Sequence, residues 1–146
     1  MKCENYMQLE FPSQSANEAF ARAAVACFAA QLDPTMDELG DIKTAVSEAV
    51  TNCIVHAYPD KLGLVTLKAR ILPGGVLDLI VKDKGCGIED VAAARKPAYT
   101  TGGAERSGMG FTIMESFMTE LKVTSQPGKG TTVHMKRKIV KRGERR

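Results

Sequence analysis

The sequence predicts a single α/β domain, in which a few helices combine with several strands. The chain has 146 residues, a length that fits one domain with a hydrophobic core of its own. Two long stretches repeat apolar residues at helical spacing, and other stretches alternate apolar and polar residues as half-buried strands do. Hydrophobic residues make up 44% and charged residues 25%, so the composition indicates neither disorder nor a fibrous repeat.

The first elements are a strand and a helix. Apolar residues alternate with polar ones over residues 7–11, which predicts a strand with one buried face. Ser15 and Glu18 then have the spacing of a capping box, ahead of a run with helical periodicity. We therefore expect a first helix to begin after Ser15.

A second, longer helix follows. Pro34 precedes another capping-box pair, Thr35 and Glu38. Apolar residues recur at helical spacing from Leu39 until Pro59, which ends the pattern because proline cannot continue a helix. This helix is amphipathic and is expected to cover the core.

The remainder of the chain reads mainly as strands. Alternation over residues 65–71, a Pro-Gly-Gly turn and a partner strand at 76–83 predict a hairpin. Residues 84–108 predict a long loop with one helical turn near 89–95, and loops of this length are usually functional. A short helix at 111–117 and two strands, at 121–125 and 131–138, complete the pattern.

The basic character of the chain is confined to its end. Residues 136–146 carry seven Lys or Arg and one Glu, a net charge of +6, whereas the whole chain carries only +3. The body of the protein is thus mildly acidic. A basic terminus of this kind can contact nucleic acid, but a solvated terminus is the simpler interpretation, and no direct nucleic-acid contact is expected.

The cysteines and the termini indicate a cytoplasmic protein. The four cysteines form no Cys-x-x-Cys pair and are predicted to be reduced thiols that mostly serve packing; they are Cys3, Cys27, Cys53 and Cys86. No signal peptide is evident at the N-terminus, and no apolar run is long enough to span a membrane.

Glu48, Asn52 and His56 form the first candidate site, on the second helix. Their spacing of four residues places them along one stripe of a helix, with a drift of only about 40° per step. Glu48 there could accept a proton from a nucleophile, and the Asn52 side-chain oxygen could bind Mg²⁺. A solvated helix face would show the same residues, so this stripe alone does not decide the matter.

Asp83, Gly85 and Gly87 form the second candidate site, at the end of the hairpin. Asp83 falls on the same strand face as the apolar residues before it, so its carboxylate points inward and needs a hydrogen-bond donor. The exocyclic amine of adenine is one such donor, and the two glycines would let a flat ring approach the backbone. A plain turn with a capping Asp is the alternative.

Two further glycine motifs follow. Gly108 and Gly110 precede the helix at 111–117, where unpaired backbone amides attract phosphate groups, and Arg106 could add a charged contact. Gly128–Thr132 opens the last strand, where Thr131 could contact a base; a tight hairpin is the alternative. Each motif is weak alone, but the four occur in a fixed order.

This order resembles the N box and the three glycine boxes of the GHKL ATPases, over residues 7–138. The resemblance implies an α/β (α+β) two-layer sandwich, the ATP-binding fold of that superfamily, with a mixed sheet and helices on one face. It also implies that ATP or ADP and Mg²⁺ bind beneath a lid formed by residues 88–108. The residues assigned to nucleotide by it are Asn52, Asp83, Gly85, Gly87, Thr100, Thr101, Gly108, Met109, Gly110 and Thr131.

The segments Ser47–Asn52 and Arg106–Glu115 resemble one branch in particular, the anti-sigma F factors of endospore-forming bacteria. The resemblance implies a homodimer that holds a sigma F factor inactive. It also implies a serine kinase that phosphorylates an anti-anti-sigma partner. In this reading Glu48 is the general base, Asn52 the Mg²⁺ ligand, Arg106 a γ-phosphate contact and Arg22 a partner contact.

Two alternatives remain. The first is a nucleotide-gated module that binds a sigma factor with little catalysis; retention of Glu48 favours the enzyme. The second is the general-stress (sigma-B) counterpart kinase, which fits less well because its first glycine box usually lacks the glycine found here at Gly87. Other GHKL roles, such as that of gyrase, need large further domains.

Overall fold

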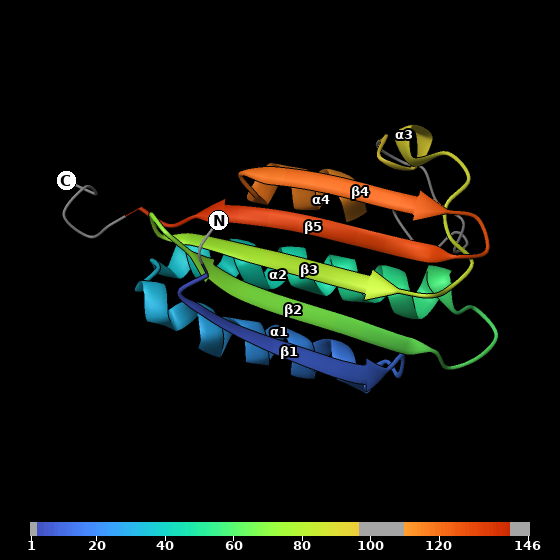
Figure 1. Cartoon of the computed structure of the whole chain (residues 1–146), viewed down its shortest axis with the longest axis horizontal. Coiled ribbons are helices and arrows are strands. Elements are labelled where there is room, and N and C mark those ends of the chain that lie inside the picture. Colours follow the sequence, from blue (N-terminus) through green and yellow to red (C-terminus); the bar gives the residue numbers. More distant parts are fainter. Residues whose placement is uncertain (1–2, 97–109, 141–146) are drawn as a thin grey trace.

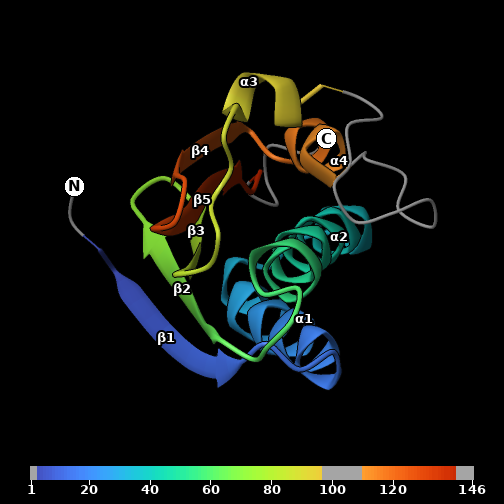
Figure 2. The ribbon, with the colours of Figure 1, turned by 90° about the vertical axis from the view of Figure 1, so that its right-hand side faces the viewer.

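A five-stranded sheet with helices packed on one side makes up the protein (Figure 1; Figure 2). The computed structural model describes residues 3–96 and 110–140. Its elements are β1 (Asn5–Pro12), α1 (Ala16–Ala29), the 3₁₀ turn η1 (Ala30–Leu32), α2 (Met36–Asn52), the π-helix η2 (Cys53–Ala57), β2 (Leu64–Leu72), β3 (Val76–Asp83), α3 (Val91–Ala94), α4 (Gly110–Phe117), β4 (Glu120–Gln126) and β5 (Gly130–Lys138). The α/β prediction and the order of its elements are confirmed.

The sheet has the strand order β1-β2-β3-β5-β4, and every hydrogen-bonded pair of strands is antiparallel. The expectation of a mixed sheet was therefore wrong. β3 and β4 run in the same direction, but β5 returns between them. The segment that joins β3 to β4 therefore crosses over to the far side of β5, and the two parallel strands are not neighbours in the sheet.

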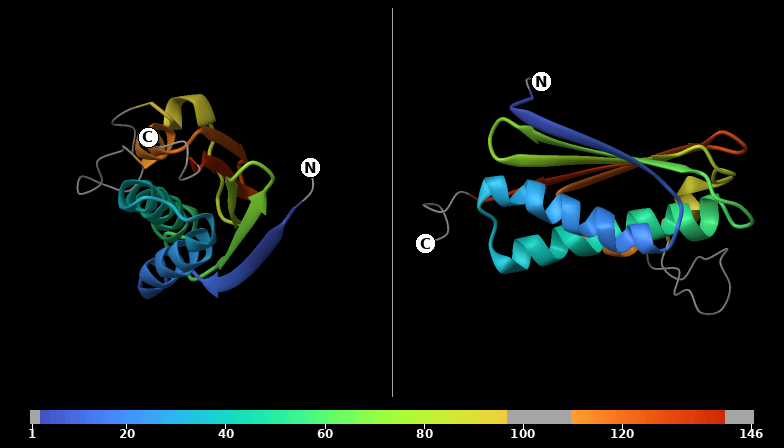
Figure 3. Two further views of the ribbon diagram at one scale, coloured as in Figure 1. Left: turned by 90° about the vertical axis from the view of Figure 1, so that its left-hand side faces the viewer. Right: turned by 90° about the horizontal axis from the view of Figure 1, so that it is seen from below.

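The core lies between the inner face of the sheet and the helices, with α1 and α2 side by side beneath it (Figure 3). α2 contributes Ile42, Val46 and Val50, none of which is exposed. The strands contribute alternate residues to the same cluster: Val65, Leu67, Ala69, Leu77, Leu79 and Val81. Because Asp83 continues this alternation on β3, its carboxylate is buried as predicted, with an exposed fraction of 6%.

The two predicted capping boxes have different outcomes. At α2 the box forms: the Glu38 N–H donates to Thr35 Oγ1 (3.1 Å), and the Thr35 N–H donates to Glu38 Oε1 (2.8 Å). At α1 it does not, because the Ser15 backbone is itself helical and the N–H of Glu18 donates to the Ser15 carbonyl. Glu18 instead pairs with Arg22, one turn later at 3.2 Å.

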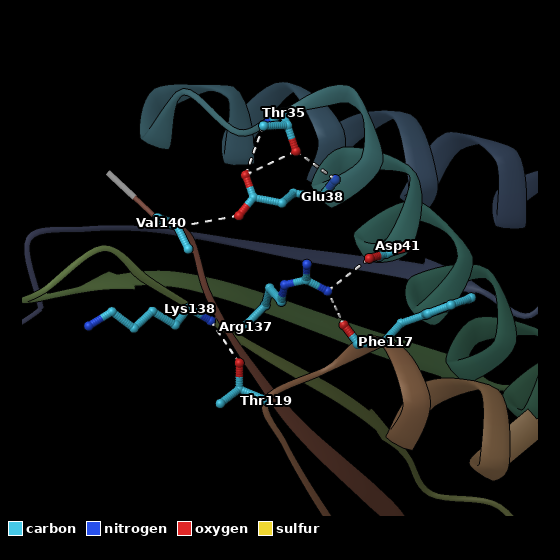
Figure 4. A network of polar contacts seen from close by, with 8 residues as sticks. All are labelled: Thr35, Glu38, Asp41, Phe117, Thr119, Arg137, Lys138 and Val140. Atoms are coloured by element: carbon cyan, nitrogen blue, oxygen red, sulfur yellow. Dashed lines mark hydrogen bonds and ion pairs between the residues drawn. The ribbon is translucent and has the colours of Figure 1, made fainter. Parts of the chain in front are cut away.

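A network of polar contacts fixes the end of the molecule where α2 begins (Figure 4). Arg137 of β5 donates to Asp41 Oδ2 of α2 (3.0 Å) and to the Phe117 carbonyl at the end of α4. The second carboxylate oxygen of Glu38 accepts from the Val140 N–H (3.3 Å). The sheet, α2 and α4 are thus tied together at this end.

All four cysteines are free thiols. Only Cys53 is buried, whereas Cys27 and Cys86 are exposed, so the expectation that they mostly serve packing was wrong. None of the helices in the described ranges combines the length and the apolar character needed to cross a membrane.

Candidate functional site

The stripe on α2 meets the first residue of α4. A Cβ atom placed on Gly110 would stand 3.3 Å from Glu48 Oε2 and 3.5 Å from both terminal side-chain atoms of Asn52. The carboxylate, the amide and the start of α4 therefore share one small region, with Glu48 and Asn52 half-buried. Two motifs that lie 58 residues apart in the sequence, at Asn52 and Gly110, are brought together by the packing of α4 on α2.

The π-helix η2 joins this region to the first glycine motif. π-turns are rare and frequently occur at functional sites. The Ala57 carbonyl at its end accepts from the Cys86 N–H (3.1 Å), and the His56 carbonyl accepts from the Cys86 thiol (3.1 Å). A Cβ on Gly85 would stand only 2.3 Å from the Ala57 oxygen, so this close approach requires glycine. His56 thus holds the motif through its backbone.

The two oxygens of Asp83 have different surroundings. Oδ1 accepts from the N–H groups of Gly85 (2.9 Å) and Thr131 (3.2 Å), which satisfy it. Oδ2 is contacted by the Cys53 thiol at 3.5 Å, a weak donor. Oδ2 therefore keeps acceptor capacity for an N–H of a ligand.

Burial raises the pKa of Asp83, and the hydrogen bonds from Gly85, Cys53 and Thr131 only partly oppose this effect. Burial, with the nearby Asp83 carboxylate, also raises the pKa of the Cys53 thiol well above its ordinary value. Cys53 therefore stays protonated and acts as a donor. A carboxylate whose charge is disfavoured by burial gains most from a ligand that donates to it.

Tyr58 holds the backbone next to Asp83. Its hydroxyl accepts from the Lys84 N–H (2.6 Å) and donates to the Leu64 carbonyl (2.8 Å), so it joins the end of β3 to the start of β2. Burial raises the pKa of the Tyr58 hydroxyl, which keeps it protonated. Sequence reasoning missed Tyr58, because a tyrosine after a helix has no distinctive pattern.

The glycines beyond Asp83 allow two turns to touch. Gly87 and Gly130 have positive φ angles of 77° and 106°. A Cβ on Gly87 would stand 2.1 Å from the backbone carbonyl oxygen of Gln126, and one on Gly130 would stand 2.2 Å from the backbone carbonyl oxygen of Asp83. Both positions therefore require glycine, and they place Thr131, which is 9% exposed, beside Asp83.

Five of the predicted site residues lie outside the described residues: Thr100, Thr101, Arg106, Gly108 and Met109. Arg22 lies on a different helix, α1, where its side chain is 41% exposed and paired with Glu18. It borders a shallow hollow between α1 and α2 lined also by Gly40, Lys43, Thr44 and Ser47.

The residues present fit a purine nucleotide better than a metal held by protein alone. In the described ranges, no group of three or more His, Cys, Asp or Glu side chains could hold a metal ion. A Mg²⁺ ion here would need Asn52 together with oxygens of a bound phosphate, which is how Mg²⁺ usually binds. The arrangement offers a buried acceptor at one end, and a carboxylate and an amide beside a helix start at the other.

Comparison with protein families finds a match to the histidine kinase-like ATPase domain over residues 11–137. Among curated proteins, the chain is 56% identical to the anti-sigma F factor of Caldanaerobacter subterraneus subsp. tengcongensis over 95% of this chain and 97% of that protein. It is 57% identical to the anti-sigma F factor of Halalkalibacterium halodurans, with 94% of each chain covered.

Solved structures share the fold. The structure of the RsbU and RsbW domains of Rv1364c from Mycobacterium tuberculosis superposes with a TM-score of 0.69 at 18% identity, over 92% of this chain and 32% of that one. The histidine kinase domain of the Erythrobacter litoralis EL346 blue-light activated histidine kinase gives a TM-score of 0.58 at 25% identity, over 84% and 60%.

Proposed function

The chain belongs to the histidine kinase-like ATPase domain family and, within it, to the anti-sigma F factors; on that premise we propose that it inhibits an F-type sigma factor and phosphorylates a serine of an anti-anti-sigma protein with ATP. The family makes it an anti-sigma factor with a kinase-like ATPase domain. The sigma F specificity, the serine substrate and the chemical step are the proposal. The observation that best supports the chemical step is the convergence of Glu48, Asn52 and Gly110, and the sigma F specificity is proposed from the relatives.

Adenine recognition is assigned to Asp83. The adenine amine would donate to Oδ2, the oxygen that keeps acceptor capacity, while Oδ1 remains held by two backbone amides. Gly85 and Gly87 hold the turn after Asp83 through close backbone contacts with Ala57 and Gln126, and Thr131 lies beside the carboxylate with a hydroxyl for the ring edge. Each of these groups is held by the protein before a ligand arrives, which lowers the cost of binding.

The phosphates are assigned to the region between α2 and α4. The start of α4 has backbone N–H groups and a helix dipole that favour anions, and Gly110 leaves room beside Glu48 and Asn52. Asn52 would hold Mg²⁺, which neutralises phosphate charge. Arg106, Gly108 and Met109 would complete the phosphate contacts, and Thr100 and Thr101 would act from the lid, as the family resemblance implies.

Glu48 is assigned as the general base. Its carboxylate would take the proton from the substrate serine while the serine oxygen bonds to the γ-phosphorus and the bond to the β-phosphate oxygen breaks, which leaves phosphoserine and ADP. Glu48 lies one helical turn before Asn52, so the base and the metal ligand address the same phosphate from one helix. Such a base typically contributes about 10²–10⁴-fold to the rate.

The partners are proposed from the relatives and from the surface at Arg22. A sigma factor of F type and an anti-anti-sigma protein would both contact this face of α1, and the anti-anti-sigma protein would also present its serine to Glu48. We also propose a homodimer that acts in the cytoplasm, a compartment in which the four free thiols would stay reduced.

The test of the proposal is single-turnover phosphate transfer from labelled ATP to a purified anti-anti-sigma protein. Glu48→Gln should slow transfer by about 10²–10⁴-fold, with nucleotide affinity and capture of sigma F nearly unchanged. Asp37→Asn, which removes an exposed carboxylate from the same helix, is the matched control and should transfer at the wild-type rate.

Three outcomes discriminate between the alternatives. Transfer by Glu48→Gln at the wild-type rate would reject the base. Capture of sigma F by a wild-type chain that transfers no phosphate would favour the nucleotide-gated module. Arg22→Ala should weaken sigma F capture without changing ADP affinity, and full capture would move the partner surface elsewhere.

A further inference from the structure

The outer face of the sheet, on the side away from the helices, carries a shallow hollow lined by lysines. The side chains on this face alternate with the core residues of β2 and β3, and no helix of the described ranges packs on it (Figure 2). The lining includes Lys68 of β2, Lys82 near the end of β3 and Lys84 just after it. The apolar side chains of Leu64 and Ile80 belong to the same lining. We call this site the lysine hollow.

The three ammonium groups of the lysine hollow lack the partners that other charges on the same face have. Farther along the face, Arg70 and His134 both contact the buried Asp78 carboxylate, at 2.7 Å and 2.5 Å. Among the described residues, no ion pair or hydrogen bond reaches the three ammonium groups of the hollow. Three lysines against one carboxylate in the lining, that of Glu10, give the hollow a net charge of +2. This face thus neutralises its charge at Asp78 and leaves positive charge at the hollow.

The spacing of the lysines suits several negative charges rather than one small anion. Lys82 and Lys84 are two residues apart, which is about 7 Å in an extended chain. Lys68 pairs directly with Ile80, so it lies diagonally from Lys82, at roughly 7–8 Å. An extended peptide repeats its side chains on one face at the same interval of about 7 Å. Acidic residues at every second position of such a peptide would therefore meet successive lysines.

We propose that the lysine hollow binds an extended acidic segment of a partner protein, with Asp or Glu at every second position. The hollow lies on the face of the sheet opposite to the Asp83 carboxylate, so the inference does not depend on the proposed nucleotide function. A second copy of the chain is a poor occupant, because a two-fold interface sets the same surface against itself and this surface is positive. Single-stranded nucleic acid fits less well, since the described lining offers no aromatic side chain on which a base could stack.

The test measures fluorescence anisotropy of a labelled peptide of about eight residues, alternating Glu and Thr, with the full chain at about 0.1 M salt, where distant charges are screened. Lys68→Gln/Lys82→Gln should weaken binding by about threefold to tenfold, as expected for two charge contacts at the surface. Lys61→Gln/Lys122→Gln is the matched control. It removes two exposed lysines outside the hollow, one of them on the same face of the sheet, and should change the affinity by less than about twofold.

Several results would overturn the inference. A wild-type chain that does not bind the peptide would do so, and so would equal losses in the two double variants, which indicate a general attraction of charge. Single-stranded DNA of equal charge that binds as tightly as the peptide would favour nucleic acid instead. A smaller particle in sedimentation velocity for Lys68→Gln/Lys82→Gln alone would assign the hollow to self-association.

Two further measurements keep the outcome interpretable. Thermal unfolding shows whether the double variant in the hollow is folded; if it is not, Lys84→Gln, at an exposed position after β3, gives the same comparison. ADP affinity of the folded variant should equal that of wild type. A wild-type chain that binds the peptide but no ADP would reject the proposed function alone, whereas one that binds ADP but no peptide rejects this inference alone.

Discussion

The two ends of α2 differ in how the acidic side chains near them are hydrogen-bonded. At its start, the carboxylate of Glu38 is satisfied by Thr35 and the Val140 N–H, and Asp41 is paired with Arg137 (Figure 4). At its other end, the helix widens into a π-turn and glycines replace side chains at the closest contacts. The carboxylates of Glu38 and Asp41 at the first end are bound by the protein, whereas Asp83, next to the second end, keeps one oxygen for a ligand.

This difference separates stability from binding along one helix. Hydrogen bonds that close a helix end and join it to the sheet lower the free energy of the folded state, and no ligand is needed. A buried carboxylate with a raised pKa has the opposite character, because it destabilises the fold until a donor reaches it. Changes at the first end should therefore alter unfolding, and changes at the second should alter nucleotide binding.

Asp83→Asn is expected to have the largest effect. The side-chain oxygen of the variant would stay on the two backbone amides, and the new amide nitrogen would then face the adenine amine, donor against donor. ADP affinity should fall on the order of 100-fold, as expected for the loss of a hydrogen bond to a charged group. Calorimetry on the folded variant checks this, with Asp60→Asn, at an exposed loop position, as the charge-matched control.

The same variant should be the more stable one at neutral pH. Because folding raises the pKa of Asp83, the folded chain binds its proton more tightly than the unfolded chain does. The free energy of unfolding therefore declines as pH rises above about 4 and through the raised pKa. Asp83→Asn removes that decline. In denaturant unfolding, the free energy of unfolding of the variant should therefore increase relative to that of wild type as pH rises. A difference between the two that does not change with pH would contradict the raised pKa.

Arg137→Met tests the other end and should have an intermediate effect. It leaves Asp41 and the Phe117 carbonyl without their donor, while the aliphatic part of the side chain keeps its packing. The free energy of unfolding should fall by about 2 kcal/mol, with ADP affinity nearly unchanged in the folded protein. Lys138→Met, at an exposed neighbouring position, is the control; a tenfold loss of ADP affinity in Arg137→Met would show that the two ends are coupled.

Local patterns made the elements of this fold predictable from the sequence. The alternation that ends at Asp83 placed its carboxylate in the core, and the spacing of Glu48 and Asn52 placed both on one side of α2. Both inferences need only the geometry of a single strand or helix. The contact of Gly110 with these two residues depends on how α4 packs, and there the family resemblance supplied what periodicity could not.

Long-range hydrogen bonds explain most of what was missed. Ser125 contacts Ile88, 37 residues away, and Tyr58 contacts Lys84, 26 residues away, so neither contact leaves a periodic trace in the sequence. The direction of neighbouring strands has the same origin, because it depends on where β5 inserts. The sequence placed Arg137 in the last strand and in the basic segment, but its hydrogen bonds to Asp41 of α2 and to the Phe117 carbonyl of α4 leave no local pattern.

The smallest expected effect comes from the two predicted capping boxes, which look alike in the sequence and differ in the structure. Thr35 accepts a hydrogen bond from the Glu38 N–H, whereas the Ser15 side chain makes no cap hydrogen bond. Thr35→Ala should therefore lower the free energy of unfolding by about 1 kcal/mol, and Ser15→Ala by less than about 0.5 kcal/mol. Denaturant unfolding of the two variants measures the difference directly, since each loses one hydroxyl at a helix start. Both should bind ADP as wild type does, because among the described residues the Thr35 hydroxyl contacts only Glu38 and the Ser15 side chain makes no cap hydrogen bond, so neither belongs to the group around Asp83 and Asn52. Equal losses of stability would mean that Ser15 caps α1 in solution after all, and the contrast between the two helix starts would then disappear.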